Sequence, residues 1–282
     1  PENRSIDNLD IKNKIIKELR SLGFTTAHLA PKHGIFRGQS GIINLQNEPK
    51  PIKSSVAQII DFKYREKGNR TYPRSLLGVI AHIRQTFYDS DWYLKAQEIY
   101  TAYPSENEPL ASNISLESLG MSRAVNKPFV FITTDETYSQ RAINISSEFD
   151  LNPWILGSGY EYRRLDYFSK TKPFFILPID FPSKPNVVKP MSDLQYSTAE
   201  LKHWDIAPDN LFYLNNAGHD FSITSHYMKK KSEFRKNLQK IIDRGLSEDI
   251  VLSALTTQPV EALGMQKSLG KIAPGYDANL VV

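Results

Sequence analysis

Short apolar runs alternate with helical patterns through the second half of the sequence, and this alternation most constrains the fold. Phe129–Ile132 is a continuous apolar run, which is typical of a strand buried on both faces. One face of a helix then follows, marked by Tyr138, Ala142, Ile145 and Phe149. Strands and helices in this order predict a parallel sheet covered by helices, so we expect an α/β fold.

The same alternation predicts the remaining elements. We expect further strands at residues 24–29, 56–60, 153–156, 174–177 and 221–224, and helices at 11–22, 75–103, 161–169, 234–242 and 247–256. Gly23 and Gly245 are expected to end two of these helices, and Ser247 to cap another. A chain of 282 residues suits a single closed (β/α)8 barrel better than an open sheet.

Two glycine-containing segments look superficially like catalytic or cofactor motifs. Gly38–Gly41 lacks the spacing of a nucleophile elbow, and Gly157–Gly159 lacks the third glycine of a dinucleotide-binding fingerprint. We predict that both are turns, and that the glycine-containing stretch from Gly34 to Leu45 is an irregular loop returning into a strand.

Composition excludes several classes of function. Lys and Arg total 35 against 31 Asp and Glu, which gives a net charge of only +4 and does not favour a nucleic-acid partner. The sequence has no cysteine, so thiol nucleophiles, disulfides and cysteine metal sites are excluded. No apolar run reaches the roughly 18 to 20 residues of a membrane span, so we expect none.

The C-terminal part carries the most distinctive motifs. The segments Ala254–Gly264, Leu269–Ile272 and Gly275–Val282 together resemble the C-terminal signature of the amidohydrolase superfamily. Other segments resemble its imidazolonepropionase-like branch, which includes large secreted or cell-envelope proteins with two such domains in tandem: Gly23–His28, Gly34–Ser40, Tyr72–Ile80, Ile83–Thr86 and His203–Pro208.

This resemblance implies a TIM-like (β/α)8 barrel that is incomplete here. The similarity starts after the family's first strand and stops within its exit strand, so we expect the first strand and most of an accompanying β-sandwich to be missing. Residues 1–268 would form the barrel, and residues 269–282 would begin the strand toward the sandwich. The resemblance also implies a longer, secreted or cell-envelope protein.

The resemblance implies a metal-dependent hydrolase, but the family's ligand positions are degenerate. The family binds zinc or another divalent metal through a His-x-His pair, histidines after strands five and six, and an aspartate after strand eight. This sequence has no His-x-His, and Ile132 stands at the strand-five position. Ser225 or His226 stands at the aspartate position. We therefore expect no catalytic residue, metal or cofactor in this chain.

Any pocket is expected at the carboxyl ends of the barrel strands. The candidates that follow predicted strands are His28, Thr134, Glu161, Asp180 and His226. A structural hydrogen bond is the simpler role for His28 and for His226. The other histidines, His33, His82, His203 and His219, are expected to be structural, and a catalytic carboxylate pair of Glu161 and Asp180 is a minor alternative.

Three functions are compatible with these observations. The leading hypothesis is a non-catalytic scaffold half that packs against a second amidohydrolase domain of the same full-length protein. The alternative is a metal-dependent hydrolase of C–N bonds in amides, cyclic amides or dipeptides, with ligands outside this sequence. The third is a binding module that holds a peptide or small amide without cleaving it.

Overall fold

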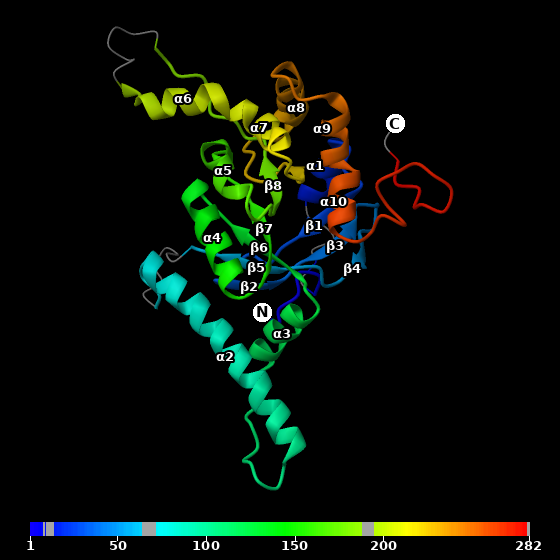
Figure 1. The fold of residues 1–282 in the computed structure, drawn as a ribbon. Coiled ribbons are helices and arrows are strands. Elements are labelled where there is room, and N and C mark those ends of the chain that lie inside the picture. The colour runs from blue at the N-terminus through cyan, green and yellow to red at the C-terminus, as the bar shows by residue number, and fades with distance from the viewer. Residues whose placement is uncertain (8, 10–13, 64–71, 188–194, 281–282) are drawn as a thin grey trace. The chain divides into compact units, whose positions relative to one another are not determined.

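A computed structural model describes residues 1–7, 9, 14–63, 72–187 and 195–280 (Figure 1). The chain forms two compact units, each built from several segments. Unit 1 consists of Pro1–Ile16, Thr25–Ile132 and Arg141–Trp154, and unit 2 consists of Lys17–Phe24, Thr133–Gln140 and Ile155–Val282.

The first half of the chain is richer in strands than the second. Its elements are α1 (Lys14–Ser21), β1 (Thr26–Leu29), β2 (Phe36–Gln39), β3 (Gly41–Asn44), β4 (Lys50–Lys53), β5 (Gln58–Asp61), α2 (Leu76–Ala102), α3 (Ile114–Ala124) and β6 (Pro128–Ile132). The second half contains α4 (Glu136–Glu148), β7 (Asn152–Leu156), η1 (Glu161–Arg164), α5 (Leu165–Phe168), β8 (Phe174–Pro178), α6 (Thr198–Ile206), η3 (Ala207–Asp209), α7 (Asn210–Asn216), β9 (Phe221–Thr224), η4 (Lys231–Glu233), α8 (Phe234–Asp243), α9 (Glu248–Leu255) and α10 (Thr257–Ala262).

Six strands form the main sheet, in the order β2-β5-β6-β7-β8-β9. β2 runs antiparallel to β5, whereas β5 and β6 are parallel, as are β8 and β9. From β5 onward the strand order follows the chain without reversal, as in a sheet that winds in one direction, and unlike a doubly wound sheet. The α/β class with a parallel sheet is therefore confirmed. Within the described residues β2 and β9 are edge strands, and no closure into a barrel is seen.

A separate three-stranded antiparallel sheet, β1-β3-β4, corrects one prediction. Residues 24–29 were expected to form a buried barrel strand, but β1 pairs with β3, where His28 lies opposite Ile42. Sheet membership depends on which distant strand offers a partner, and the short sequence of β1 does not encode it. His28 is exposed on this strand.

Most of the other predicted helices and strands are confirmed. β6 to β9 fall within one residue of the predicted strands, and the predicted helix at 75–103 is α2. Gly23 and Gly245 follow α1 and α8 with positive φ, and the Ser247 side chain accepts a hydrogen bond from the Ile250 backbone. Gly157–Gly159 is a bend, as predicted, but Gly38–Gly41 lies in β2 and β3 and is not a turn.

The two ends of the predicted domain are not decided. Residues 269–280 contain no helix or strand, and Val281 and Val282 lie outside the described residues. The first predicted helix, at residues 11–22, is described from Lys14 onward as α1. Residues 10–13 lie outside the described part of the chain. The exit strand therefore stays a prediction. None of the helices that the structure describes is long and apolar enough to span a membrane.

Candidate functional site

The segments that directly follow β6, β7, β8 and β9 lie along one edge of the main sheet, and all of them belong to unit 2. The Thr133 backbone N–H donates to Leu156 O (3.1 Å), and the Gly157 N–H donates to Ile176 O (2.9 Å). Pro178 lies opposite Thr224 in the parallel pair of β8 and β9. Residues that directly follow these strands therefore share the edge at which α/β proteins commonly place their sites.

Glu161 is a fully enclosed charged side chain at this edge. It is fully buried at the start of η1, where a carboxylate needs hydrogen-bond donors to offset its lost hydration. One carboxylate oxygen, Oε1, accepts from the Ser158 N–H at 2.7 Å and from the Ser158 hydroxyl at 3.2 Å. The other, Oε2, accepts from the Gly159 N–H at 3.0 Å and from Asn210 Nδ2 at 2.8 Å. Both oxygens are thus occupied by protein donors.

The turn Gly157–Gly159 has the shape that this carboxylate requires. A Cβ at position 157 would lie 2.7 Å from Glu161 Oε1 and 3.0 Å from Leu177 Cδ2, so only glycine fits without displacement. Gly159 has a φ of +89°, a conformation that other residues rarely adopt. Successive N–H groups directed at one anion form a nest, and the anion is a carboxylate of the same chain.

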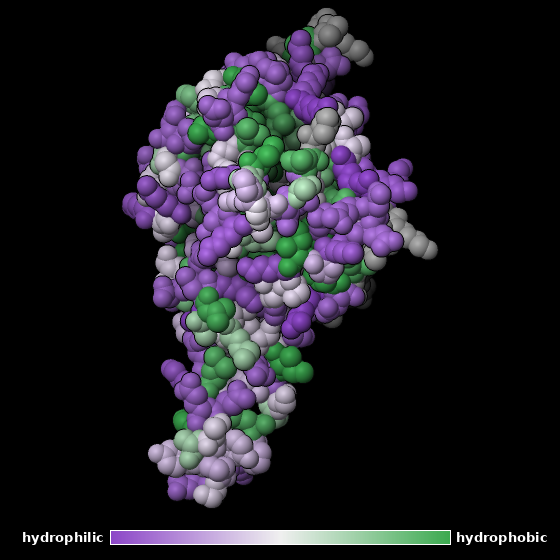
Figure 2. Space-filling view, turned by 90° about the vertical axis from the view of Figure 1, so that its right-hand side faces the viewer, coloured by the Kyte–Doolittle hydropathy of each residue, from purple (hydrophilic) through white to green (hydrophobic). Residues whose placement is uncertain are grey.

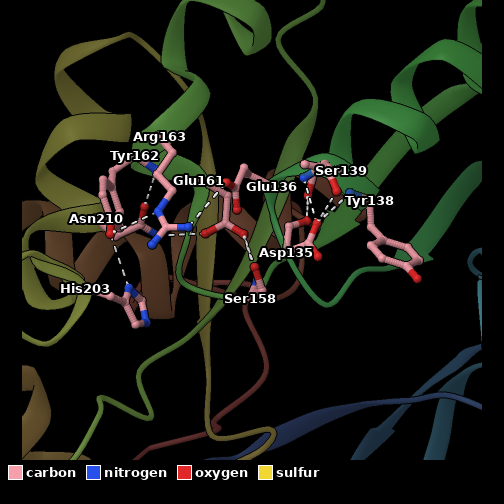
Figure 3. A network of polar contacts seen from close by, with 11 residues as sticks. Asp135, Glu136, Tyr138, Ser139, Ser158, Glu161, Tyr162, Arg163, His203 and Asn210 are labelled. Carbon is pink, nitrogen blue, oxygen red and sulfur yellow. Dashed lines mark hydrogen bonds and ion pairs between the residues drawn. The ribbon is translucent and has the colours of Figure 1, made fainter. Parts of the chain in front are cut away.

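Asn210 connects this turn to the start of α7. Its side chain is buried, and its Oδ1 accepts from the Tyr162 N–H at 2.8 Å while its Nδ2 donates to Glu161. Figure 3 shows Asn210 and Ser158 on opposite sides of the Glu161 carboxylate. The amide therefore joins two segments that are 49 positions apart in the sequence.

The polar side chains after β6 are likewise engaged in local structure. Thr133 is buried, donates to Leu156 O at 2.9 Å and accepts from the Ser139 hydroxyl at 3.1 Å. Asp135 Oδ1 accepts from the backbone N–H groups of Thr137 (2.8 Å) and Tyr138 (3.0 Å), which satisfies the first turn of α4 (Figure 3). Neither side chain is placed to act as a base or nucleophile.

A stack of rings lies beside the Glu161 turn. The His203 ring is stacked on Tyr160 with ring centres 3.7 Å apart and 17° between the planes. Tyr162 lies nearly parallel to His203 at 6.1 Å, and its hydroxyl is 3.3 Å from His203 Nδ1. Arg163 Nε donates to the same hydroxyl at 3.4 Å. Since Nε can only donate, the hydroxyl proton of Tyr162 is available to His203 Nδ1.

Arg163 gives the outer side of this stack its charge. Its guanidinium lies 4.5 Å from the centre of the Tyr160 ring, and its Nη1 is 3.4 Å from Glu136 Oε1. The ion pair joins η1 to the first turn of α4 (Figure 3). Burial raises the pKa of the Tyr160 hydroxyl, so this hydroxyl is protonated at neutral pH. The arrangement offers an aromatic surface with one cation and no activated nucleophile.

His203 makes the stability of the fold sensitive to acid. Burial, assisted by the positive charge of Arg163, lowers the pKa of His203 from 6.5 to about 4. The unfolded chain therefore takes up a proton at higher pH than the folded chain, and stability present above pH 6.5 is lost as the pH falls toward 4. Burial lowers the pKa of His219 as well, which acts in the same direction.

We expect the free energy of unfolding to fall by about 2 kcal/mol through His203 over this pH range, after allowance for partial solvent screening. Denaturant unfolding at a series of pH values would measure it. His203→Gln, which cannot titrate, should show a flatter dependence than the wild type. Identical slopes for the two proteins would contradict the assignment.

The other predicted candidates have diverse surroundings. His28 belongs to unit 1, where its Nε2 is 2.7 Å from the Ser40 hydroxyl. Thr134 is exposed after β6. Asp180 lies at the surface after β8, where partial desolvation raises the pKa of its carboxyl group and Lys229 opposes that rise. Glu161 is buried and Asp180 is not, which does not favour the carboxylate pair considered from the sequence.

The three degenerate ligand positions are poorly suited to zinc. Ile132 is apolar, Ser225 is buried, and His226 is exposed with its ring 4.2 Å from that of Tyr227. Hydrolytic zinc usually needs about three protein ligands. In the described part of the chain, no group of three or more His, Asp or Glu side chains could hold a metal ion.

Sequence reasoning missed the residues that surround Glu161. The sequence did not single out Asn210, Tyr162 or Arg163. His203 was expected to be structural, but the sequence indicated no partner for it. A spacing of 41 to 49 residues separates His203 and Asn210 from their partners on η1. No local periodicity encodes such pairs.

Comparison with solved structures identifies the fold. The chain is similar to the crystal structure of an amidohydrolase from Thermotoga maritima, with 19% identity and a TM-score of 0.75, covering 97% of this chain and 70% of that one. At this identity the similarity establishes a shared fold, which agrees with the amidohydrolase resemblance of the sequence. No family profile matches the sequence, and neither does any curated protein.

Two weaker similarities concern peptidases. A prolidase complexed with N-methylphosphonate-L-proline shares 15% identity over 79% of this chain and 60% of that one, with a TM-score of 0.44. A Xaa-Pro dipeptidase with methionine bound in its active site shares 12% identity over 57% of this chain and 40% of that one, with a TM-score of 0.40. TM-scores this low carry no conclusion about this chain.

Proposed function

We propose that this chain is a non-catalytic part of a larger hydrolase with an amidohydrolase fold, in which it serves as a scaffold or binding half. In this proposal its sheet belongs to an incomplete TIM-like barrel of the imidazolonepropionase-like branch. Its partner is a second amidohydrolase domain of the same full-length protein, and the protein is secreted or lies in the cell envelope. The fold similarity and the motif resemblance support the amidohydrolase assignment. The hydrogen bonds at the site support the absence of catalytic activity.

The single observation that carries this proposal is the state of the Glu161 carboxylate. Glu161 follows β7 at the edge where this fold is expected to place its ligands, so it is the best candidate for a metal ligand or a general acid. Its oxygens already accept four hydrogen bonds, from Ser158, Gly159 and Asn210. A carboxylate offers about four lone pairs in all, so binding a metal would require breaking this turn.

The neighbouring side chains do not replace Glu161 as a ligand or a general base. A general base needs a free lone pair within hydrogen-bond reach of the proton that it removes. His203 Nδ1 lies against the Tyr162 hydroxyl, and the Ser158 hydroxyl is directed at Glu161. These residues fix the segments that follow β6 and β7, which is the task of a scaffold. The family's metal therefore does not fit the residues of this edge.

We expect this chain to retain far less than stoichiometric zinc and to hydrolyse neither dipeptides nor cyclic amides. The reason is that three ligands are needed and this edge supplies at most one or two weak ones. Protein refolded with excess zinc and then dialysed would be assayed for bound metal and for turnover. Stoichiometric zinc, together with hydrolysis that His226→Ala abolishes, would refute the proposal and favour the metal-dependent alternative.

A further inference from the structure

A row of hydrogen-bonded polar side chains lies in unit 1 at the start of β6. Lys127, directly before β6, donates from Nζ to the Ser55 hydroxyl at 2.7 Å. The Ser55 hydroxyl donates to Oε1 of Gln39. The amide nitrogen of Gln39 donates to the Ser118 hydroxyl on α3 at 2.8 Å. Because Gln39 is buried and held at both ends of its amide, this row fixes the position of the Lys127 ammonium.

Two further cationic residues lie beside this row. Arg4 pairs with Gln39 in an isolated parallel bridge, and Lys53 ends β4 two residues before Ser55. Burial lowers the pKa of the Lys127 ammonium, and the positive charges of Arg4 and Lys53 lower it further. Three cations from separate segments of unit 1 are therefore close enough to repel one another.

Carboxylates of the described residues do not offset the charge of Lys127. The charges that act on its pKa are those of Arg4 and Lys53, both positive. The carboxylate of Glu2, two residues before Arg4, is engaged elsewhere, since its Oε2 accepts from the Ser115 hydroxyl at 2.6 Å. A partly buried charge without an opposite charge lowers stability, and a bound anion would remove that penalty.

The donors at this place indicate the chemistry of the anion. Ser55 accepts one N–H of the Lys127 ammonium, which has three, so the others can reach a ligand. A phosphate group carries a charge of about −1.5 to −2 at neutral pH and offers three strong acceptor oxygens. It therefore matches several neighbouring cations better than a carboxylate, which carries a single charge.

An apolar ligand is less suited to the surface of this chain. Figure 2 shows hydrophilic residues over much of the face that it draws, with hydrophobic residues among them. Arg4 and Lys53 are themselves exposed. On such a surface the arrangement of charge is a better guide to a ligand than apolar area.

We propose that Lys127, Arg4 and Lys53 form a binding site for a phosphate group at the amino end of β6. Ser55 and Gln39 hold the Lys127 ammonium toward the ligand, which is inorganic phosphate or a small soluble phosphate monoester. This inference concerns unit 1 and does not depend on the proposed loss of metal chemistry at the carboxyl ends of the strands.

Thermal unfolding of the whole chain tests the proposal with inorganic phosphate as the probe. In buffers of equal ionic strength at neutral pH, phosphate at several times its Kd should raise the Tm by about 2–4 °C relative to chloride. Acetate, which carries a single carboxylate, should have a much smaller effect. Isothermal titration calorimetry should show a single phosphate bound per chain.

Variants of the protein locate the binding. Lys127→Met keeps most of the apolar stem and removes the charge, so it should abolish the effect of phosphate. Arg4→Gln, at an exposed position, should weaken phosphate binding about two- to fivefold, which still decides the question if Lys127→Met does not fold. Lys95→Met removes an exposed lysine of α2 in the same unit, and this matched control should respond to phosphate as the wild type does. Circular dichroism would confirm that each variant is folded.

Three outcomes would overturn the proposal. Equal Tm values in phosphate and chloride would show that these cations hold no phosphate. A phosphate effect that persists undiminished in Lys127→Met and Arg4→Gln would assign the binding to an adventitious ion only. Co-sedimentation with vesicles that contain phosphatidic acid, abolished by Lys127→Met and without any effect of inorganic phosphate, would identify a lipid surface instead of a soluble phosphate.

Discussion

Glu161→Ala is expected to lower the free energy of unfolding by about 3–5 kcal/mol, because it leaves several buried donors without a partner. The N–H groups of Ser158 and Gly159 and the amide of Asn210 all donate to this one carboxylate. Each buried donor that loses its acceptor costs about 1–3 kcal/mol, and water entering the space recovers part of that cost. Urea or guanidinium unfolding would measure the change.

Two further variants test whether the loss of stability comes from the Glu161 carboxylate. Glu161→Gln keeps the size but turns an NH₂ group toward donors, so we expect about half of the loss. Glu98→Ala, at an exposed position near the C-terminal end of α2, removes a carboxylate of the same type and should cost less than about 0.5 kcal/mol. Equal effects of Glu161→Ala and Glu98→Ala would show that the network does not stabilise the chain.

Asn210 should be energetically coupled to Glu161. Its Nδ2 is 2.8 Å from Glu161 Oε2, so either single substitution already breaks their hydrogen bond. The double variant Glu161→Ala, Asn210→Ala should therefore cost less than the sum of the two single variants. A carboxylate kept for catalysis behaves differently, since its replacement often leaves stability unchanged or raises it. The sign of the effect thus distinguishes a scaffold from a reaction site.

The strands β6 to β9 could be predicted because they are apolar runs that lie mostly buried in the sheet. Phe129, Val130 and Phe131 are all buried in β6, and a run of this kind has few alternatives in a globular protein. Gly245 and Ser247 similarly determine where α8 ends and α9 begins through local backbone chemistry. These features depend on residues that are neighbours in the sequence. The sequence pattern alone was therefore sufficient to predict them.

The first half could not be predicted as well, because its strands depend on distant partners. β1 pairs antiparallel with β3, and β2 pairs antiparallel with β5 across a bulge between Phe36 and Gly38. Nothing in four-residue strands such as these specifies which sheet they join. The glycines at positions 38 and 41 favoured a turn locally, but close packing explains them. A Cβ at position 38 would lie 2.2 Å from Asn3 O, and one at 41 would lie 2.5 Å from the Ile6 side chain.

The sequence predicted that Glu161 follows a strand, and in the structure Glu161 follows β7. Its role in a pocket stays a prediction. Whether a carboxylate there is free or saturated depends on Asn210 and on the backbone of the Gly157–Gly159 turn. Such partners are a tertiary property, so the sequence identified Glu161 as a pocket candidate without its hydrogen-bond partners.

Phe87→Ala is expected to lower the free energy of unfolding by about 3–5 kcal/mol, because it empties the centre of the unit 1 core. Phe87 is fully buried on the inner face of α2. Its ring is stacked on Phe149 at 4.8 Å and meets the edges of Phe36 and Phe129 at 5.6 and 5.8 Å. These three rings come from a strand, a second strand and a segment after α4, so their collapse into the cavity is restricted.

The matched control is Trp92→Ala, five residues along the same helix but on the exposed face. It removes a larger aromatic side chain, yet we expect a cost below about 1 kcal/mol because Trp92 is already 62% exposed. Denaturant midpoints of the two variants would be compared at equal helix content. A cost for Trp92→Ala as large as that for Phe87→Ala would mean that Trp92 packs against this chain and would contradict its assignment to the exposed face of α2. A large cost at Phe87 with little at Trp92 would show that the stability of unit 1 depends on the buried face of α2 and not on its exposed face.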